Sequence, residues 1–252
     1  MNLDQLPKPL ILGHRGDKVH APENTLSAFR LAMQNGAEGV ELDTKLTADG
    51  FVVIMHDQTL DRTTNGKGSI SRYTLNELRA LDAGSHFSPQ FKDERIPTLE
   101  EVFDAVGPNG IIDIELTNYA SPGDALPVKV AELIKAHHVE ERVLVSSFHP
   151  MNLIRFSRKM PGVPAGLLTE VGKKGNFARG PIARLIPHQL LISYYTDVQD
   201  YLIAREHRHA GKMYAWIEAQ PEGIRTLFEQ GIDGIITDDP GLARRIMPGQ
   251  GT

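Results

Sequence analysis

Short apolar runs of strand length alternate along the chain with stretches in which apolar residues recur at helical spacing. Most of the short runs turn polar only at their last residues, which is typical of parallel strands buried on both faces. This pattern predicts strands over Leu10–Gly13, Gly39–Thr44, Val52–His56, Ile111–Thr117, Val143–Phe148, Ala165–Thr169, Leu190–Tyr194, Lys212–Ile217 and Gly234–Thr237. It predicts helices over Thr25–Asn35, Thr98–Val106, Ala125–His137, Met151–Lys159, Val198–His209, Glu222–Gln230 and Pro240–Ile246.

The alternation of strands and helices predicts repeated βαβ units and therefore a parallel sheet. The strands suffice for a closed (β/α)8 barrel with one additional strand. An open doubly wound sheet is the alternative, but the glycine-rich dinucleotide fingerprint that such folds carry after the first strand is missing. We therefore predict an α/β fold of the TIM type.

Residues from about 57 to 95 interrupt this rhythm. The segment is polar and rich in turn residues, and it is much longer than a usual barrel loop. We interpret it as a small inserted subdomain after the second barrel strand, one that caps the barrel mouth and shapes a substrate pocket. The chain has no internal repeat or low-complexity linker, so we predict a single domain over 1–252 with an insertion at about 57–95.

Length, charge and composition fit this prediction and exclude several classes of function. A chain of 252 residues suits one large barrel. The formal charge of −5 is spread along the chain, without the basic stripe that nucleic-acid binding requires. The absence of cysteine excludes disulfides, thiolate nucleophiles and cysteine-based metal sites. Because neither a secretory signal pattern nor a membrane-spanning window is present, we expect a cytoplasmic protein without stable membrane insertion. Nothing in the sequence indicates an oligomeric state.

The first predicted strand ends in His14, Arg15 and Gly16. The histidine can act as a general acid or base near neutral pH, and the guanidinium presents a fork of donors that suits two phosphate oxygens. The glycine lets the backbone turn so that both side chains face one site. Taken alone, the triplet is equally compatible with a solvated surface turn.

Two predicted strands each end in a pair of carboxylates, and the spacing of two places both members of a pair on one face. Carboxylates held together need a compensating cation or protons, and hard oxygen ligands suit Mg²⁺ or Ca²⁺. The first pair is Glu41 and Asp43, for which salt bridges at an exposed strand end are the alternative. In the second pair, we take Glu115 as the third ligand and place Asp113 deeper, as an outer or structural partner.

A second histidine, His56, appears where another apolar run ends. Two histidines at strand ends suit paired proton transfer, in which one deprotonates the nucleophile and the other protonates the leaving alkoxide. A cation between them stabilises charge on phosphate oxygens. The strand-end residues together favour a metal-dependent phosphodiesterase.

At these residues the chain resembles the glycerophosphodiester phosphodiesterase family, and the resemblance extends through nearly its whole length. The segments that carry it, in order, are GHRGDKVHAPENTLSAF, GVELDTKLTADGFVVIMHDQTLDRTTNGKG, RIPTLEEVF, IIDIELTN, VSSFHP and GIDGIITDDP. The resemblance implies a TIM-type barrel with a small inserted subdomain. It implies His14 and His56 as the acid–base pair and Arg15 as the phosphate clamp. The implied ligands of one divalent cation, Mg²⁺ or Ca²⁺, are Glu41, Asp43 and Glu115.

Two further positions of the family pattern lie before the first predicted helix. The resemblance implies that Glu23 lies near the site, where we count it among the substrate-binding residues. We assign Asn24 a structural role instead, as the N-cap of the helix that follows.

The sequence departs from the family pattern at two positions. Thr117 stands where the family usually has a phosphate-facing lysine, and Ala219 where it usually has an asparagine. Lys45 cannot be assumed to replace the missing cation, because it either shares the face of Asp43 or already lies in the loop. Trp216 is retained and is expected to form a wall of the substrate pocket.

The leading hypothesis is hydrolysis of a small-molecule glycerophosphodiester to glycerol 3-phosphate and an alcohol such as choline or ethanolamine. Either water or a substrate hydroxyl is the nucleophile. Lysophospholipase D-type cleavage of a lipid ranks second, because no membrane anchor is evident. A barrel that binds phosphodiesters with impaired catalysis ranks third: Thr117 supports it, whereas the retained histidines and carboxylates oppose it.

Overall fold

The computed structural model of the protein describes residues 1–216 and 220–247, and its elements follow the predicted pattern closely. The strands are β1 (Leu10–His14), β2 (Gly39–Leu46), β3 (Val52–Ile54), β4 (Ile111–Leu116), β5 (Val143–Ser147), β6 (Ala165–Leu168), β7 (Leu190–Tyr194), β8 (Lys212–Trp216) and β9 (Gly234–Thr237). The helices are α1 (Leu26–Gln34), α2 (Leu75–Arg79), α3 (Leu99–Val106), α4 (Leu126–Ala136), α5 (Pro150–Lys159), α6 (Asn176–Arg179), α7 (Asp200–Arg208), α8 (Pro221–Glu229) and α9 (Pro240–Ile246). Ile217, the last residue of one predicted strand, lies outside the described residues.

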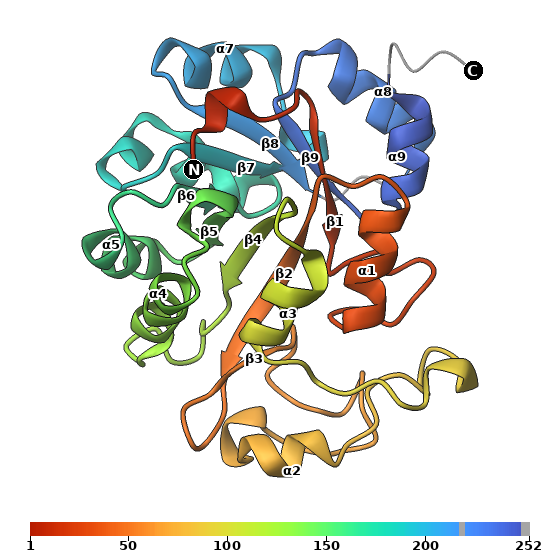
Figure 1. Ribbon diagram of the computed structural model, residues 1–252. Coiled ribbons are helices and arrows are strands. Elements are labelled where there is room, and N and C mark those ends of the chain that lie inside the picture. Colours follow the sequence, from red (N-terminus) through yellow and green to blue (C-terminus); the bar gives the residue numbers. More distant parts are fainter. Residues whose placement is uncertain (217–219, 248–252) are drawn as a thin grey trace.

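All strands except β3 are parallel and close into a barrel, which the larger helices surround (Figure 1). The order is β1-β9-β8-β7-β6-β5-β4-β2, and β1 pairs with β2 to complete the ring. This arrangement confirms the predicted TIM-type fold. Because these strands are parallel, their C-terminal ends meet at one mouth, where such barrels carry their functional residues.

β3 runs in the opposite direction to the barrel strands. It pairs antiparallel with the outer end of β2, so that Ile54 lies opposite Thr44. The chain therefore returns toward the mouth along β3, and Met55 N donates to Asp43 O at 2.9 Å. His56 reaches the mouth from this returning strand, a direction that the pattern of apolar residues did not indicate.

Alternate residues of the barrel strands divide between two apolar regions. In β1, Leu10 and Leu12 belong to the same apolar cluster as Ile192 of β7 and Tyr214 of β8, whereas Ile11 belongs to a separate cluster with residues of the outer helices. His14 continues the alternation of Leu10 and Leu12, so its side chain lies at the end of this inner column. The site is consequently built directly on the apolar interior of the barrel.

The segment between β3 and α3 has a small apolar cluster of its own, which includes Met55, Leu60, Ile70, Leu78 and Ile96. In Figure 1 this segment, with α2, extends from one end of the barrel. The helices α2 and α6 were not predicted, because helices of 5 and 4 residues leave almost no periodic signal. The division into one domain with an insertion stays a prediction.

Within the ranges that the structure describes, no helix is both long and apolar enough to cross a membrane. The cytoplasmic location stays a prediction.

Candidate active site

A tight turn at the end of β1 brings two functional side chains to the mouth. Arg15 has a φ of 55° and Gly16 a φ of 86°, and a Cβ on Gly16 would lie 2.5 Å from the backbone of Ala28. Only glycine fits there. The left-handed conformation of Arg15 is sparsely populated for residues with a side chain. It is stabilised by Glu41, whose backbone O and Oε2 accept from Arg15 N at 2.9 and 3.1 Å.

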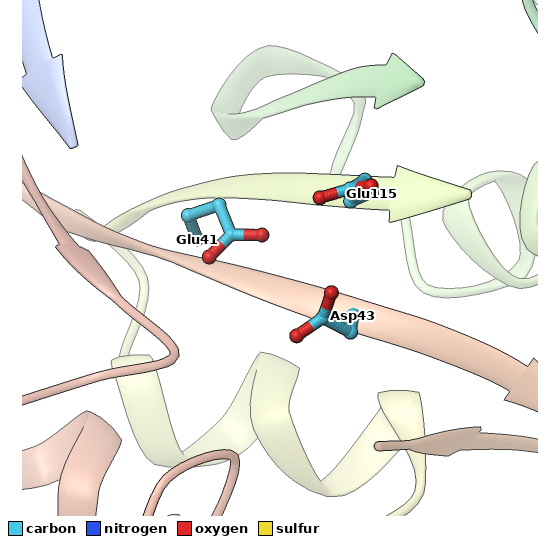
Figure 2. A group of neighbouring side chains, drawn as sticks. All are labelled: Glu41, Asp43 and Glu115. Carbon is cyan, nitrogen blue, oxygen red and sulfur yellow. The ribbon is translucent and has the colours of Figure 1, made fainter. Parts of the chain in front are cut away.

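Strand register brings the two acidic pairs together beside the first histidine. His14 lies opposite Glu41, Glu41 lies opposite Asp113, and Asp43 lies opposite Glu115. Figure 2 shows the carboxylates of Glu41, Asp43 and Glu115 lying close together above β2 and β4. One oxygen of each lies within 4.8 Å of the others. The three predicted metal ligands therefore share one site.

These three carboxylates fit the requirements of a bound cation. Glu41 and Asp43 are buried, and Glu41 Oε1 has no hydrogen-bond partner. Burial, reinforced by the neighbouring carboxylates, raises the pKa of Glu41 well above its usual range and that of Glu115 to about 8. Ionised carboxylates crowded into a buried site are unfavourable without a compensating charge. A hard divalent cation with oxygen ligands would supply it.

Asp43 is the member of the cluster whose negative charge the protein stabilises most. Burial opposes its ionisation, but Arg15 has the largest opposing effect and lowers the pKa of Asp43; Asn24 Nδ2 also donates to Asp43 Oδ2 at 2.8 Å. The prediction that Asn24 caps the helix is wrong. Thr25 caps α1, because its Oγ1 accepts from Ala28 N at 3.3 Å, while the φ of 58° at Asn24 places its amide beside Asp43.

His14 is held by a carboxylate from the opposite end of the chain. Its Nδ1 lies 2.6 Å from Oδ1 of Asp238, which follows β9, and Lys18 Nζ lies 3.1 Å from the same oxygen. Its Nε2 faces the acidic cluster, 3.9 Å from Glu41 Oε2. Burial lowers the pKa of His14 to about 4, although Asp238 acts in the opposite direction. The ring is therefore neutral at pH 7.

His56 is oriented in the same way but is far more exposed. Its Nδ1 lies 2.6 Å from Asp57 Oδ1, and its side chain is 43% exposed. Arg62 Nε lies 2.8 Å from Asp57 Oδ2, and Arg62 Nη1 lies 2.7 Å from Glu23 Oε2. Glu23 in turn accepts from Arg15 Nη1 at 2.9 Å. A chain of ion pairs thus connects the predicted substrate-binding residues Arg15 and Glu23 to His56.

Asp113 lies deeper than the other carboxylates, as expected from its position in β4. It is fully buried, accepts a hydrogen bond from Ser146 Oγ at 2.7 Å, and has no partner at Oδ2. Burial raises its pKa to about 7. Asp113 therefore forms part of the floor of the site, below the cluster of Glu41, Asp43 and Glu115.

Aromatic rings form the opposite side of the pocket. Ring centroids are 6.1 Å apart for Tyr119 and Phe148, 5.4 Å for Phe148 and Trp216, and 5.2 Å for Trp216 and Tyr194. Tyr119 Oη also donates to Glu115, so the two sides of the pocket touch there. The pocket is lined by His14, Arg15, Glu41, His56, Asp113, Glu115, Tyr119, Ser146, Phe148, Leu168, Trp216 and Ile236.

The structure adds site residues that sequence reasoning missed. Asp57 and Asp238 each follow a strand and orient a histidine, so a search for carboxylates at every strand end would have found them. Arg62, Tyr119 and Ser146 gave no local signal, because their roles depend on contacts with Glu23, Glu115 and Asp113, which come from other parts of the chain.

Comparison with known proteins identifies the family of this chain. Residues 14–242 match the model of the glycerophosphoryl diester phosphodiesterase family. The chain belongs to this family. The matched range spans most of the chain, and it confirms the family that the sequence motifs predicted.

Individual relatives in this family cover nearly the whole chain. A glycerophosphodiester phosphodiesterase of Caldanaerobacter subterraneus is 38% identical over 234 residues, which span 92% of this chain and 95% of the relative. A phosphodiesterase of Oleispira antarctica, solved in complex with the product sn-glycerol-3-phosphate, has a TM-score of 0.85 at 27% identity and covers 95% of this chain and 96% of its own. A glycerophosphodiester phosphodiesterase of Thermotoga maritima has a TM-score of 0.75 at 27% identity and covers 96% of this chain and 100% of its own. The predicted enzyme class, a phosphoric diester hydrolase acting on glycerophosphodiesters, is thereby confirmed.

The two departures from the family pattern have different outcomes. Ala219 lies outside the described residues. Thr117, which stands where the family usually has a lysine, is contacted by another lysine: Lys45 Nζ lies 2.5 Å from Thr117 Oγ1. Lys45 is therefore a residue of β2 and shares the face of Asp43, and it does not lie in the following loop.

Proposed function

We propose that this phosphodiesterase hydrolyses glycerophosphodiesters to glycerol 3-phosphate and an alcohol by metal-dependent general acid–base catalysis. One observation carries the proposal: two histidines, each with an aspartate on Nδ1, border a pocket beside three carboxylates that lie within 4.8 Å of one another. Paired imidazoles and a cation site are the groups that displacement at a phosphodiester requires. The O. antarctica relative was solved with sn-glycerol-3-phosphate, which supports this product class.

Glu41, Asp43 and Glu115 would hold one divalent cation, Mg²⁺ or Ca²⁺. When bound, it supplies positive charge that polarises the phosphate and compensates the carboxylates. Arg15 stands beside Asp43 and Glu23, where its guanidinium can bind a phosphate oxygen and keep the reacting group above the cluster. Nearby carboxylates keep this guanidinium charged, since Asp43 and Glu23 raise its pKa against the effect of burial.

The two histidines move protons at Nε2, because Nδ1 of each is bound to an aspartate. His14 is neutral at pH 7, the form that accepts a proton from the nucleophile, whether water or a substrate hydroxyl. His56, on the open side of the mouth, then protonates the leaving alcohol oxygen. Asp238 and Asp57 fix the ring orientations, and Asp238 also favours the charged form of His14.

We also propose that segment 57–95 supports the site and does not act as a lid. Asp57 and Arg62 of this segment hold His56 and Glu23 in place. Among the described residues that line the pocket, none lies within 57–95.

The proposal is tested with a panel of glycerophosphocholine, glycerophosphoethanolamine and a lysophospholipid, assayed with EDTA and then with Mg²⁺ or Ca²⁺ restored. We expect turnover of the water-soluble diesters that EDTA abolishes and a divalent cation restores. Preferred turnover of the lysophospholipid would instead support lipid cleavage. No turnover of any substrate with either cation would indicate a binding protein.

The acid–base assignment is tested with His14→Ala and His56→Ala, each of which should lower kcat by about 10²- to 10⁴-fold. His209→Ala is the matched control, since His209 is an exposed residue at the end of α7. Wild-type kcat in either of the first two variants would refute the assignment.

A further inference from the structure

Lys45 is a buried cation next to the acidic cluster. β2 extends to Leu46. Glu41, Asp43 and Lys45 occupy every second position along it, so their side chains lie on the same face. Lys45 is 3% exposed. It therefore lies one step nearer the rim of the mouth than Asp43 and has almost no contact with bulk water.

The ammonium group is fixed by Thr117, which directly follows the neighbouring strand β4. Lys45 Nζ donates to Thr117 Oγ1 at 2.5 Å and to Thr117 O at 3.0 Å. The threonine hydroxyl in turn donates to Thr44 O at 2.7 Å, so its orientation is fixed. An ammonium group has three N–H donors, and these contacts use two.

Lys45 has no ion-pair partner within 4.0 Å among the described residues. The carboxylates of Asp43, Glu115 and Asp57 attract its charge over a longer range, and Arg15 repels it. A buried charge without a contacting counter-ion is costly. A bound anion would compensate it, and a phosphodiester above the carboxylate cluster carries such a charge.

We propose that Lys45 is a phosphate-binding residue of this enzyme, with Thr117 as the support that holds its ammonium at the site. The family motif would place a lysine at position 117, just after the strand of Glu115. Here the ammonium group belongs to Lys45 of the adjacent strand β2, and it contacts Thr117, the residue that stands in place of that lysine. The inference rests on the proposed function, because it assumes that a phosphodiester binds above Glu41, Asp43 and Glu115.

A purely structural role for Lys45 makes a different prediction. If Lys45 only supports the fold around the carboxylates, its removal should distort the site and weaken the binding of both the cation and the anion. If it binds phosphate, its removal should weaken the anion and leave cation binding unchanged or stronger, because a positive charge beside the cation is lost. The two roles therefore differ in the sign of one measurable effect.

The experiment measures two affinities by titration calorimetry: that of Ca²⁺ for the phosphate-free protein, and that of glycerol 3-phosphate at saturating Ca²⁺. In Lys45→Met we expect the dissociation constant of glycerol 3-phosphate to rise about tenfold or more, the size of a charge-assisted hydrogen bond. The Ca²⁺ affinity should stay equal or increase. Lys129→Met, an exposed lysine on α4, is the matched control and should change neither value.

The double variant Lys45→Met/Thr117→Lys returns the charge to the strand of Glu115 and should restore most of the affinity for glycerol 3-phosphate. An unchanged dissociation constant for glycerol 3-phosphate in Lys45→Met would overturn the inference, and so would a joint loss of both affinities that the double variant does not reverse. If the wild-type protein neither binds glycerol 3-phosphate with Ca²⁺ nor hydrolyses any diester, the proposed function fails first. A wild type that does both, with an unaffected Lys45→Met variant, would refute only the role of Lys45.

Discussion

The two sides of the pocket are built in different ways. The charged side comes from β1, β2, β4 and the returning β3, and hydrogen bonds or ion pairs fix most of its groups, including His14, Asp43 and His56. The apolar side is formed by Phe148, Trp216 and their neighbours, which touch through ring edges and faces.

This difference suits two different tasks: the charged side acts on the reacting phosphate, and the aromatic side accommodates the rest of the substrate. Charged groups must be held within a fraction of an ångström to act on a reacting phosphate, which requires several bonds for each side chain. Rings that contact the alcohol half of a substrate need only the right shape and an apolar surface. We therefore expect substitutions on the charged side to lower kcat and those on the aromatic side to raise KM.

The largest effect is expected from Glu115→Gln, which keeps the shape of the side chain but removes one charge of the cluster. We predict that kcat/KM falls about 10²- to 10³-fold and that more divalent cation is needed for half-maximal activity. Cation titrations of the initial rate measure both. Glu132→Gln, on the exposed face of α4, is the control. A wild-type cation requirement in Glu115→Gln would remove this residue from the ligand set.

Asp238→Asn should have a smaller effect on the same side. The neutral amide no longer favours the charged form of His14, so we predict a fall in kcat of about 10- to 100-fold with little change in KM. Steady-state kinetics separate the two constants. A change confined to KM would show that Asp238 acts on substrate binding and not through His14.

Trp216→Leu tests the aromatic side. Losing the ring contacts with Phe148 and Tyr194 should raise KM for glycerophosphodiesters up to about tenfold, while kcat changes by no more than a few-fold. If kcat of this variant fell as much as that of Asp238→Asn, the assignment of catalysis to the charged side and substrate binding to the aromatic side would be wrong.

The smallest effect concerns stability without metal. The pKa of Glu115 is about 8 and that of Asp113 about 7, well above the values near 4 of the unfolded chain. Between pH 8.5 and 6.5 the folded protein therefore takes up protons that the unfolded chain does not, so the metal-free protein gains stability as pH falls, by about 1 kcal/mol per pH unit for each proton.

His14 affects stability in the opposite direction, because its pKa is lowered to about 4. Its contribution is lost only as the pH falls from about 6.5 to about 4, which is below the range of about pH 8.5 to 6.5. Thermal unfolding in EDTA should thus show Tm rising from pH 8.5 to 6.5, and a divalent cation should flatten this dependence. A Tm that rises with pH in EDTA over the same range would show that the cluster does not carry excess charge.

The sequence was sufficient for the order of the strands and longer helices, for the barrel and for the residues at strand ends. His14, Glu41 and Glu115 stood out because apolar runs end in groups that can do chemistry, and this signal is local. The assignment of Asn24 failed for the same reason: a capping residue before a helix is a local pattern, whereas its bond to Asp43 joins two segments.

Local periodicity thus determined which residues form strands and which of them lie at strand ends. Only the tertiary structure decided how those ends meet. The register between β1, β2 and β4 aligns His14 with Glu41, and closure of the barrel brings Asp238 beside His14. The reversed direction of β3 delivers His56, and the pairing of β2 with β4 places Lys45 on Thr117. Register and closure depend on packing across the whole barrel, so they leave no signal in any single segment of the chain.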